Sequence, residues 1–105
     1  RVVPGAVDGH LDTIEIDGST LRVEGWAATK SRAARRVAVF VDGRFMVAPQ
    51  PLSARPDLAR VRGLRFALAG FKIIASLDER ADTGDVRVFG VADGRASELP
   101  RAKPD

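Results

Sequence analysis

The chain has no cysteine and no tyrosine, and it holds one histidine, one tryptophan and one methionine among its 105 residues. Without cysteine it can form neither a disulfide framework nor a zinc site with thiolate ligands. His10 is the single histidine, and histidine is the usual general base of hydrolytic enzymes. No apolar run approaches the roughly 20 residues that a membrane-spanning helix needs. These absences favour a domain that is not an enzyme.

The length is that of one domain, so we expect residues 1–105 to form a single folding unit. Residues 1–8 contain Pro4 and Gly5, which interrupt regular pairing, and should form a linker or an edge segment. Residues 100–105 should form a flexible tail. Because the sequence starts without methionine, we also expect it to be part of a longer protein.

The charge is moderately basic, with 17 lysines and arginines against 14 acidic residues. A basic excess suits an anionic partner, although acidic residues spread along the chain also fit an ordinary solvated surface. No aromatic residue lies within the basic cluster of Lys30, Arg32, Arg35 and Arg36, which argues against nucleic acid. Contact with an anionic lipid surface needs charge alone, so Arg32, Arg35 and Arg36 are candidates for it.

The clearest structural signal lies in residues 36–49. Two apolar runs, residues 37–41 and 44–48, flank the dipeptide Asp42-Gly43. Valine and phenylalanine favour strands, and Asp-Gly can supply the two positive φ angles of a type I′ turn. The pattern predicts a β-hairpin. Since neither run alternates simply, both strands should lie inside a sheet.

Alternating apolar residues predict further strands, several of them separated by turn dipeptides such as Asp17-Gly18. Ile14 and Ile16 should face inward. A short helix is expected within residues 52–63, where Pro56 suits its first position. Short antiparallel strands with one long crossover indicate an all-β sandwich or barrel. The strands outside the hairpin are expected at residues 10–16, 20–28, 70–77, 85–91 and 95–99.

The position of Trp26 depends on Gly25. Strict alternation along residues 20–28 places Trp26 on the same side as Arg22 and Glu24. A bulge at Gly25 would shift the phase by one residue and bring Trp26 into the core, where tryptophan commonly anchors small sandwiches. We favour the core position for Trp26 and for most of the five phenylalanines. If Trp26 is exposed, it becomes a carbohydrate-binding candidate together with Arg22 and Glu24.

Two other chemistries have weaker signals. His10 could act on a substrate only if folding brought a serine and an acid to it, and a surface histidine beside a turn is the simpler interpretation. The loop with Asp78, Glu79, Asp82 and Asp85 has the composition of a turn, and its spacing matches no EF-hand calcium loop. We therefore expect no metal and no cofactor.

Four short motifs occur in an order that resembles a recurring bacterial β-sandwich domain. The resemblance covers residues 9–99. It implies a non-catalytic, immunoglobulin-like fold of about seven strands, with one short helix in a crossover. In the usual pattern an acidic segment follows the first motif, whereas this chain has Thr29-Lys30-Ser31 there. The motifs are Gly25-Trp26-Ala27, Val41-Asp42-Gly43-Arg44, Arg55-Pro56-Asp57 and Gly70-Phe71.

Domains of this kind are accessory modules of large cell-envelope proteins, including membrane glycosyltransferases of polysaccharide assembly. The resemblance thus implies a module on the extracytoplasmic side of the membrane that positions glycan or docks on its parent. The expected partners are domains of the parent protein, an envelope glycan or an anionic lipid surface. The alternative is an autonomous carbohydrate-binding domain that uses Trp26.

Overall fold

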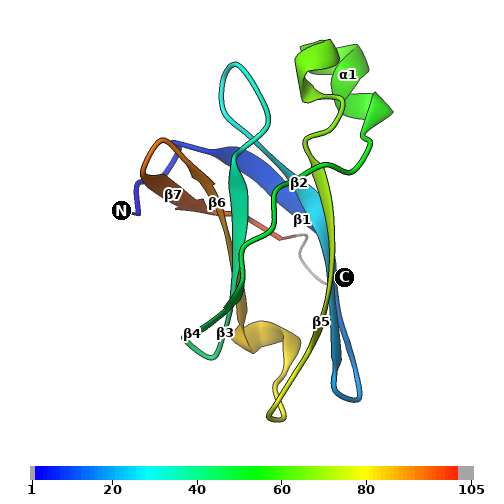
Figure 1. The fold of residues 1–105 in the computed structure, drawn as a ribbon, viewed down its shortest axis with the longest axis vertical. Coiled ribbons are helices and arrows are strands. Elements are labelled where there is room, and N and C mark those ends of the chain that lie inside the picture. The colour runs from blue at the N-terminus through cyan, green and yellow to red at the C-terminus, as the bar shows by residue number, and fades with distance from the viewer. Residues whose placement is uncertain (1, 102–105) are drawn as a thin grey trace.

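The computed structural model describes residues 2–101, which form two antiparallel sheets packed against each other (Figure 1). The first sheet has the order β1-β2-β5 and the second the order β4-β3-β6-β7. The predicted all-β sandwich of seven strands is therefore confirmed. Strands one, two and five share one sheet, and strands three, six and seven the other, as in immunoglobulin-like domains. The strands are β1 (Asp8–Asp17), β2 (Thr20–Ala28), β3 (Arg36–Val41), β4 (Arg44–Val47), β5 (Gly70–Ser76), β6 (Val86–Ala92) and β7 (Arg95–Glu98).

The predicted helix is α1 (Pro56–Arg62), and it lies on the crossover from β4 to β5. Gly63 ends it with a φ of 108°, and a 3-10 turn, η1 (Leu64–Phe66), follows. A second 3-10 turn, η2 (Thr83–Asp85), precedes β6. In Figure 1, α1 and the loop of residues 29–35 lie at one end of the sandwich, and η2 lies at the other.

The core lies between the sheets and is built mainly from alternate apolar residues. Val39 of β3 and Val88 of β6 face each other across the pairing of these strands, and both are completely buried. From the first sheet, Leu21 and Val23 are also completely buried. Ile14 and Ile16 pack against this core, as expected, although each stays partly exposed. Period-two alternation thus identifies the inner faces of the strands that have no bulge.

The hairpin forms as predicted, with φ angles of 50° at Asp42 and 78° at Gly43. The same conformation recurs at Asp93 and Gly94, between β6 and β7. The turn after β1 differs by one residue from the expectation. Asp17 still pairs with Thr20, so the two turn residues between them begin with Gly18, whose φ is 61°.

The expectation that both hairpin strands lie inside a sheet is wrong for β4, which is an edge strand. A break in register between Val39 and Phe40 leaves Met46 as an extra residue in β4. Met46 and Val47 pack against the core, whereas Phe45 points away from it. The second apolar run therefore combines inward and outward residues because the strand is bulged.

Both terminal segments of the described chain pair with edge strands. The amide of Val3 donates to the carbonyl of Ala96 at 2.7 Å, so residues 2–7 form an edge segment beside β7. Pro100 was expected to begin a flexible tail, yet its carbonyl accepts from the amide of Leu11 at 2.8 Å. The pairing continues to Arg101, and residues 102–105 of the predicted tail lie outside the described residues.

Candidate functional site

Arg22, Glu24 and Trp26 lie together on the outer face of the first sheet. The pairing of β2 with β5 runs without a break from Thr20 to Trp26, so β2 has no bulge at Gly25. Strict alternation therefore holds, and the expected core position of Trp26 is wrong. Trp26 is nevertheless partly buried, because residues outside the sheet cover it. Arg22 is exposed, and its guanidinium lies 3.9 Å from the carboxylate of Glu15.

The bulge lies in β1 instead. Leu11 and Thr13 pair with consecutive residues of β2, which leaves Asp12 as the extra residue. The carbonyl oxygen of His10 approaches Gly25 so closely that a β-carbon on Gly25 would collide with it. Gly25 is therefore needed because the neighbouring strand comes close, and not because its own strand bends.

Trp26 is covered by the crossover that contains α1. The guanidinium carbon of Arg62 lies 4.7 Å from the centre of the indole ring, a cation–π arrangement. Arg62 also contacts Asp8 at 2.8 Å. Leu58 and Phe66 belong to a small buried cluster, and Trp26 packs against it. One face of the indole is thus occupied by the protein's own cation.

Arg55 fastens the start of α1 to the first sheet. It binds Asp57 through two hydrogen bonds of 3.0 and 2.8 Å, and it binds Asp12 at 3.0 Å. These bonds lower the pKa of Asp57 to about 2, chiefly through the hydrogen bond from Arg55, and they raise the pKa of Arg55. The stem of Arg55 lies across Gly70, where a β-carbon would come within 2.6 Å of it.

These contacts join three of the four sequence motifs at one place. Trp26 pairs with Gly70 across the sheet, and Arg55 lies over that glycine. Beside them is a shallow recess of about 200 Å³ with Glu24 and Lys72 at its wall. These three motifs therefore hold α1 against the first sheet, which is a structural role.

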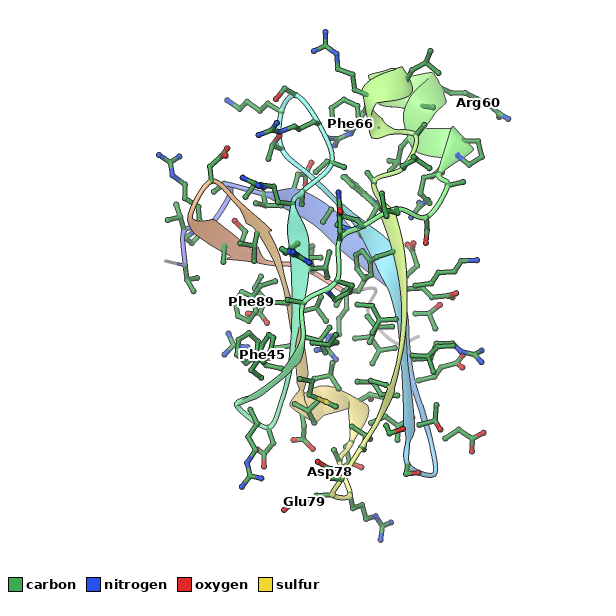
Figure 2. All side chains as sticks on the ribbon, viewed as in Figure 1. Phe45, Arg60, Phe66, Asp78, Glu79 and Phe89 are labelled. Carbon is green, nitrogen blue, oxygen red and sulfur yellow. The ribbon has the colours of Figure 1, made fainter. Side chains whose placement is uncertain are left out.

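A second surface is the aromatic face, formed by Phe40, Phe45 and Phe89 on the outside of the second sheet. The ring centres of Phe40 and Phe45 are 5.7 Å apart, and those of Phe40 and Phe89 are 5.6 Å apart, both edge to face. Phe45 is 60% exposed. Figure 2 shows Phe45 and Phe89 on the side of the ribbon that faces away from the first sheet.

The expectation that most phenylalanines lie in the core is wrong for these three. Phe71 lies in the main core and Phe66 in the cluster beside Trp26. The available signal was the position of Phe40 between Val39 and Val41, because buried neighbours on both sides place the middle residue on the opposite face.

The aromatic face borders an apolar recess of about 440 Å³. Arg87 lies at its rim, 5.3 Å from the ring centre of Phe89, and binds Glu98 through contacts of 2.7 and 3.2 Å. The hydrogen bond from Arg87 lowers the pKa of Glu98 and raises the pKa of Arg87. The recess is lined by Val2, Ala38, Phe40, Gly43, Arg87, Phe89, Val91 and Ala96.

The basic residues proposed for lipid contact are all exposed. Arg32 lies 3.7 Å from Asp93, and its backbone amide donates to the hydroxyl of Thr29, which shapes the loop. Arg36 donates to the carbonyl of Ala48 at 3.3 Å, along the hairpin. Arg35 and Arg32 thus belong to the end of the sandwich that carries α1, whereas the side chain of Arg36 turns toward the hairpin.

His10 and the acidic loop have ordinary surroundings. The Nδ1 atom of His10 lies 3.4 Å from Asp12, and both side chains are exposed. In the acidic loop, a carboxylate oxygen of Asp85 accepts from the amide of Asp82 at 2.9 Å, which starts η2. Within residues 2–101, no three potential metal ligands come together.

The comparisons with known proteins match no family model, no curated protein and no solved structure. None of the helices within residues 2–101 combines the length and the apolar character that a membrane crossing requires.

Proposed function

We propose that this chain is a non-catalytic accessory module of a larger bacterial envelope protein, such as a polysaccharide-assembly glycosyltransferase. On this proposal it lies on the extracytoplasmic side of the membrane and docks on another domain of its parent through the aromatic face. Two observations support this function: the order of the four motifs, and the exposure of Phe45 next to Phe40, which lines an apolar recess. The exposed aromatic face is the observation that carries it.

The composition of the aromatic face suits a protein partner. Aromatic side chains and arginine are enriched at the centres of protein interfaces, and a polar rim usually surrounds them. Here Phe40 and Phe89 line the recess, Phe45 packs against Phe40, and the Arg87–Glu98 pair supplies a polar rim. The edge strand β4 lies next to the patch and adds backbone groups that a partner strand can pair with.

A carbohydrate-binding domain centred on Trp26 has less support. A sugar stacks on a free aromatic face, whereas Arg62 already occupies one face of Trp26, and Trp26 also packs against the cluster of Leu58 and Phe66. Arg22 and Glu24 lie on the same sheet face as Trp26, so a small polar ligand beside it is the form of this function that the geometry allows.

The test uses the longer reading frame that encodes this chain. The domain and the rest of the parent are purified separately, and their binding is measured by calorimetry. Phe45→Ser should weaken binding by about 30-fold, the effect of losing one interface hot spot. Ile74→Ser removes an apolar side chain that is at least as exposed, from the other sheet, and should leave binding unchanged. Equal affinity of the Phe45→Ser and wild-type domains would overturn the proposal.

A further inference from the structure

The end of the sandwich with α1 exposes large apolar side chains. Val61 is 84% exposed and Leu64 is 87% exposed, on consecutive turns of α1 and η1. Arg60 and Arg65 lie beside them in sequence and are also exposed. Figure 2 shows Arg60 projecting from the outer side of α1. Exposed valine and leucine flanked by arginines form an amphipathic tip.

The tip belongs to a wider basic end. Ala33, from the loop of residues 29–35, packs against the cluster that holds Leu58 and Phe66, so the loop and α1 are neighbours. The two segments lie at the same end of the molecule in Figure 1. Within residues 2–101, no carboxylate lies within ion-pair distance of four of the basic side chains at this end, namely Lys30, Arg35, Arg60 and Arg65.

The opposite end is acidic. Asp78 and Glu79 lie there, at the far end from Arg60 in Figure 2. Asp17 is the last residue of β1, and Asp42 directly follows β3. The longest dimension of the molecule is 39 Å, and the view places this axis vertically. Lys30, Arg35, Arg60 and Arg65 thus lie at one end of the long axis and most of these carboxylates at the other, which favours one orientation at a negatively charged surface.

We propose that this basic end contacts an anionic lipid bilayer. Val61 and Leu64 enter the boundary between head groups and acyl chains, while Lys30, Arg35, Arg60 and Arg65 lie among the lipid phosphates. An interfacial element of this kind binds through buried apolar area together with attraction to anionic lipids. Arg55 and Arg62 hold α1 on the sheet, so the tip is positioned before it meets the membrane.

A lipid surface fits these residues better than a protein partner does. A stable protein interface covers about 800 Å² on each partner, with a broad and well-packed centre. Two apolar side chains on a convex tip, surrounded by long cationic side chains, provide little such area. Phosphate groups of a bilayer, by contrast, match every one of the four cations. This surface is separate from the aromatic face, so either proposal can fail without the other.

The test is sedimentation of the whole domain with vesicles. Binding should be clear with phosphatidylcholine vesicles that contain a quarter phosphatidylglycerol, should be absent with phosphatidylcholine alone, and should fall as salt is raised. The double substitution Val61→Ser and Leu64→Ser should weaken binding at least about tenfold, and so should Arg60→Ala with Arg65→Ala. All four residues are exposed, and circular dichroism verifies that the variants fold.

The matched control removes two cations from the acidic end, by Arg44→Ala with Arg80→Ala. Both are exposed, and Arg44 lies 3.7 Å from Glu79 there. This variant has the same net charge as Arg60→Ala with Arg65→Ala but should bind vesicles nearly as the wild type does. Failure of the wild type to bind anionic vesicles would overturn the proposal, and so would equal losses in the two arginine variants. Phe45→Ser should leave vesicle binding unchanged.

Discussion

The carbonyl oxygen of His10 lies closer to the position of a β-carbon on Gly25 than the 3.0 Å that real β-carbons keep. Gly25→Ala should therefore lower the free energy of unfolding by about 1–3 kcal/mol, the usual cost of forcing an extra carbon into a packed site. Equilibrium unfolding in urea measures this loss of stability. Gly84→Ala is the control, because a β-carbon there meets nothing within 4 Å. Equal stability of the Gly25→Ala and Gly84→Ala variants would contradict the structure at the β1 bulge.

Ile73 and Ile74 are neighbours in β5 with opposite environments, 5% and 69% exposed. Ile73→Ala should cost about 2–4 kcal/mol of unfolding free energy, since it leaves a cavity between the sheets. Ile74→Ala deletes the same atoms from the solvent face and should change stability by less than about 0.5 kcal/mol. Chemical denaturation of both variants tests which face is buried, and similar losses would mean that the sheet has another register.

Asp57 makes the stability depend on pH in the acid range. Its pKa is lowered to about 2 by the hydrogen bond from Arg55, against an ordinary value of 3.8. The native state therefore binds this proton less readily than the unfolded chain does. The stabilisation is complete above the unfolded pKa and is lost as the pH falls through about 2. Wild type should exceed Asp57→Asn in urea midpoint at pH 5, and this difference should shrink toward pH 2.

The control for the role of Arg55 is to measure the effect of Asp57→Asn on the urea midpoint in a protein that also carries Arg55→Gln. Without the guanidinium, the effect of Asp57→Asn on the urea midpoint should become much smaller, because the hydrogen bond that contributes most to the lowered pKa is gone. An effect that persisted unchanged in this background would assign the lowered pKa of Asp57 to its hydrogen bonds with backbone amides at the start of α1, and not to Arg55.

The fluorescence of the domain comes from Trp26 alone, because it is the single tryptophan, so it reports on the contact between α1 and the first sheet. Arg62→Ala should uncover one face of the indole, shift the emission to longer wavelength and increase quenching by acrylamide. The lost cation–π contact should cost about 1 kcal/mol of stability. Arg60→Ala, on the same helix but exposed, should leave the emission unchanged. Identical spectra for the two variants would show that Arg62 does not cover Trp26 in solution.

Sequence reasoning succeeded where structure depends on neighbours along the chain. The Asp42-Gly43 turn is set by two residues with positive φ, and the inward direction of Val86 and Val88 follows from their own strand. The two-sheet fold also followed from the number and spacing of such strands. These features need no knowledge of which strand pairs with which.

It failed where the outcome depends on a distant segment. The position of Trp26 was tied to a bulge at Gly25, yet the extra residue is Asp12 in the partner strand. Burial of Trp26 then comes from Arg62 on the crossover, far along the chain. Strand pairing and the packing of the crossover decide the environment of Trp26, and a local pattern does not contain them. The outward direction of Phe40, by contrast, could have been predicted from its position between Val39 and Val41.

The pairing of both terminal segments has a consequence for biosynthesis. The amide of Val7 donates to the hydroxyl of Ser97 at 3.0 Å, and the amide of Leu11 donates to the carbonyl of Pro100 at 2.8 Å. The first strand therefore finds its last partners only among residues translated near the end of this domain. A nascent chain still lacking β7 and Leu99 would leave one side of β6 unpaired and the core between the sheets incomplete. Folding of this domain should therefore be completed only after residue 101 has emerged from the ribosome. It should also be slow, as is usual for sandwiches whose contacts join distant parts of the chain.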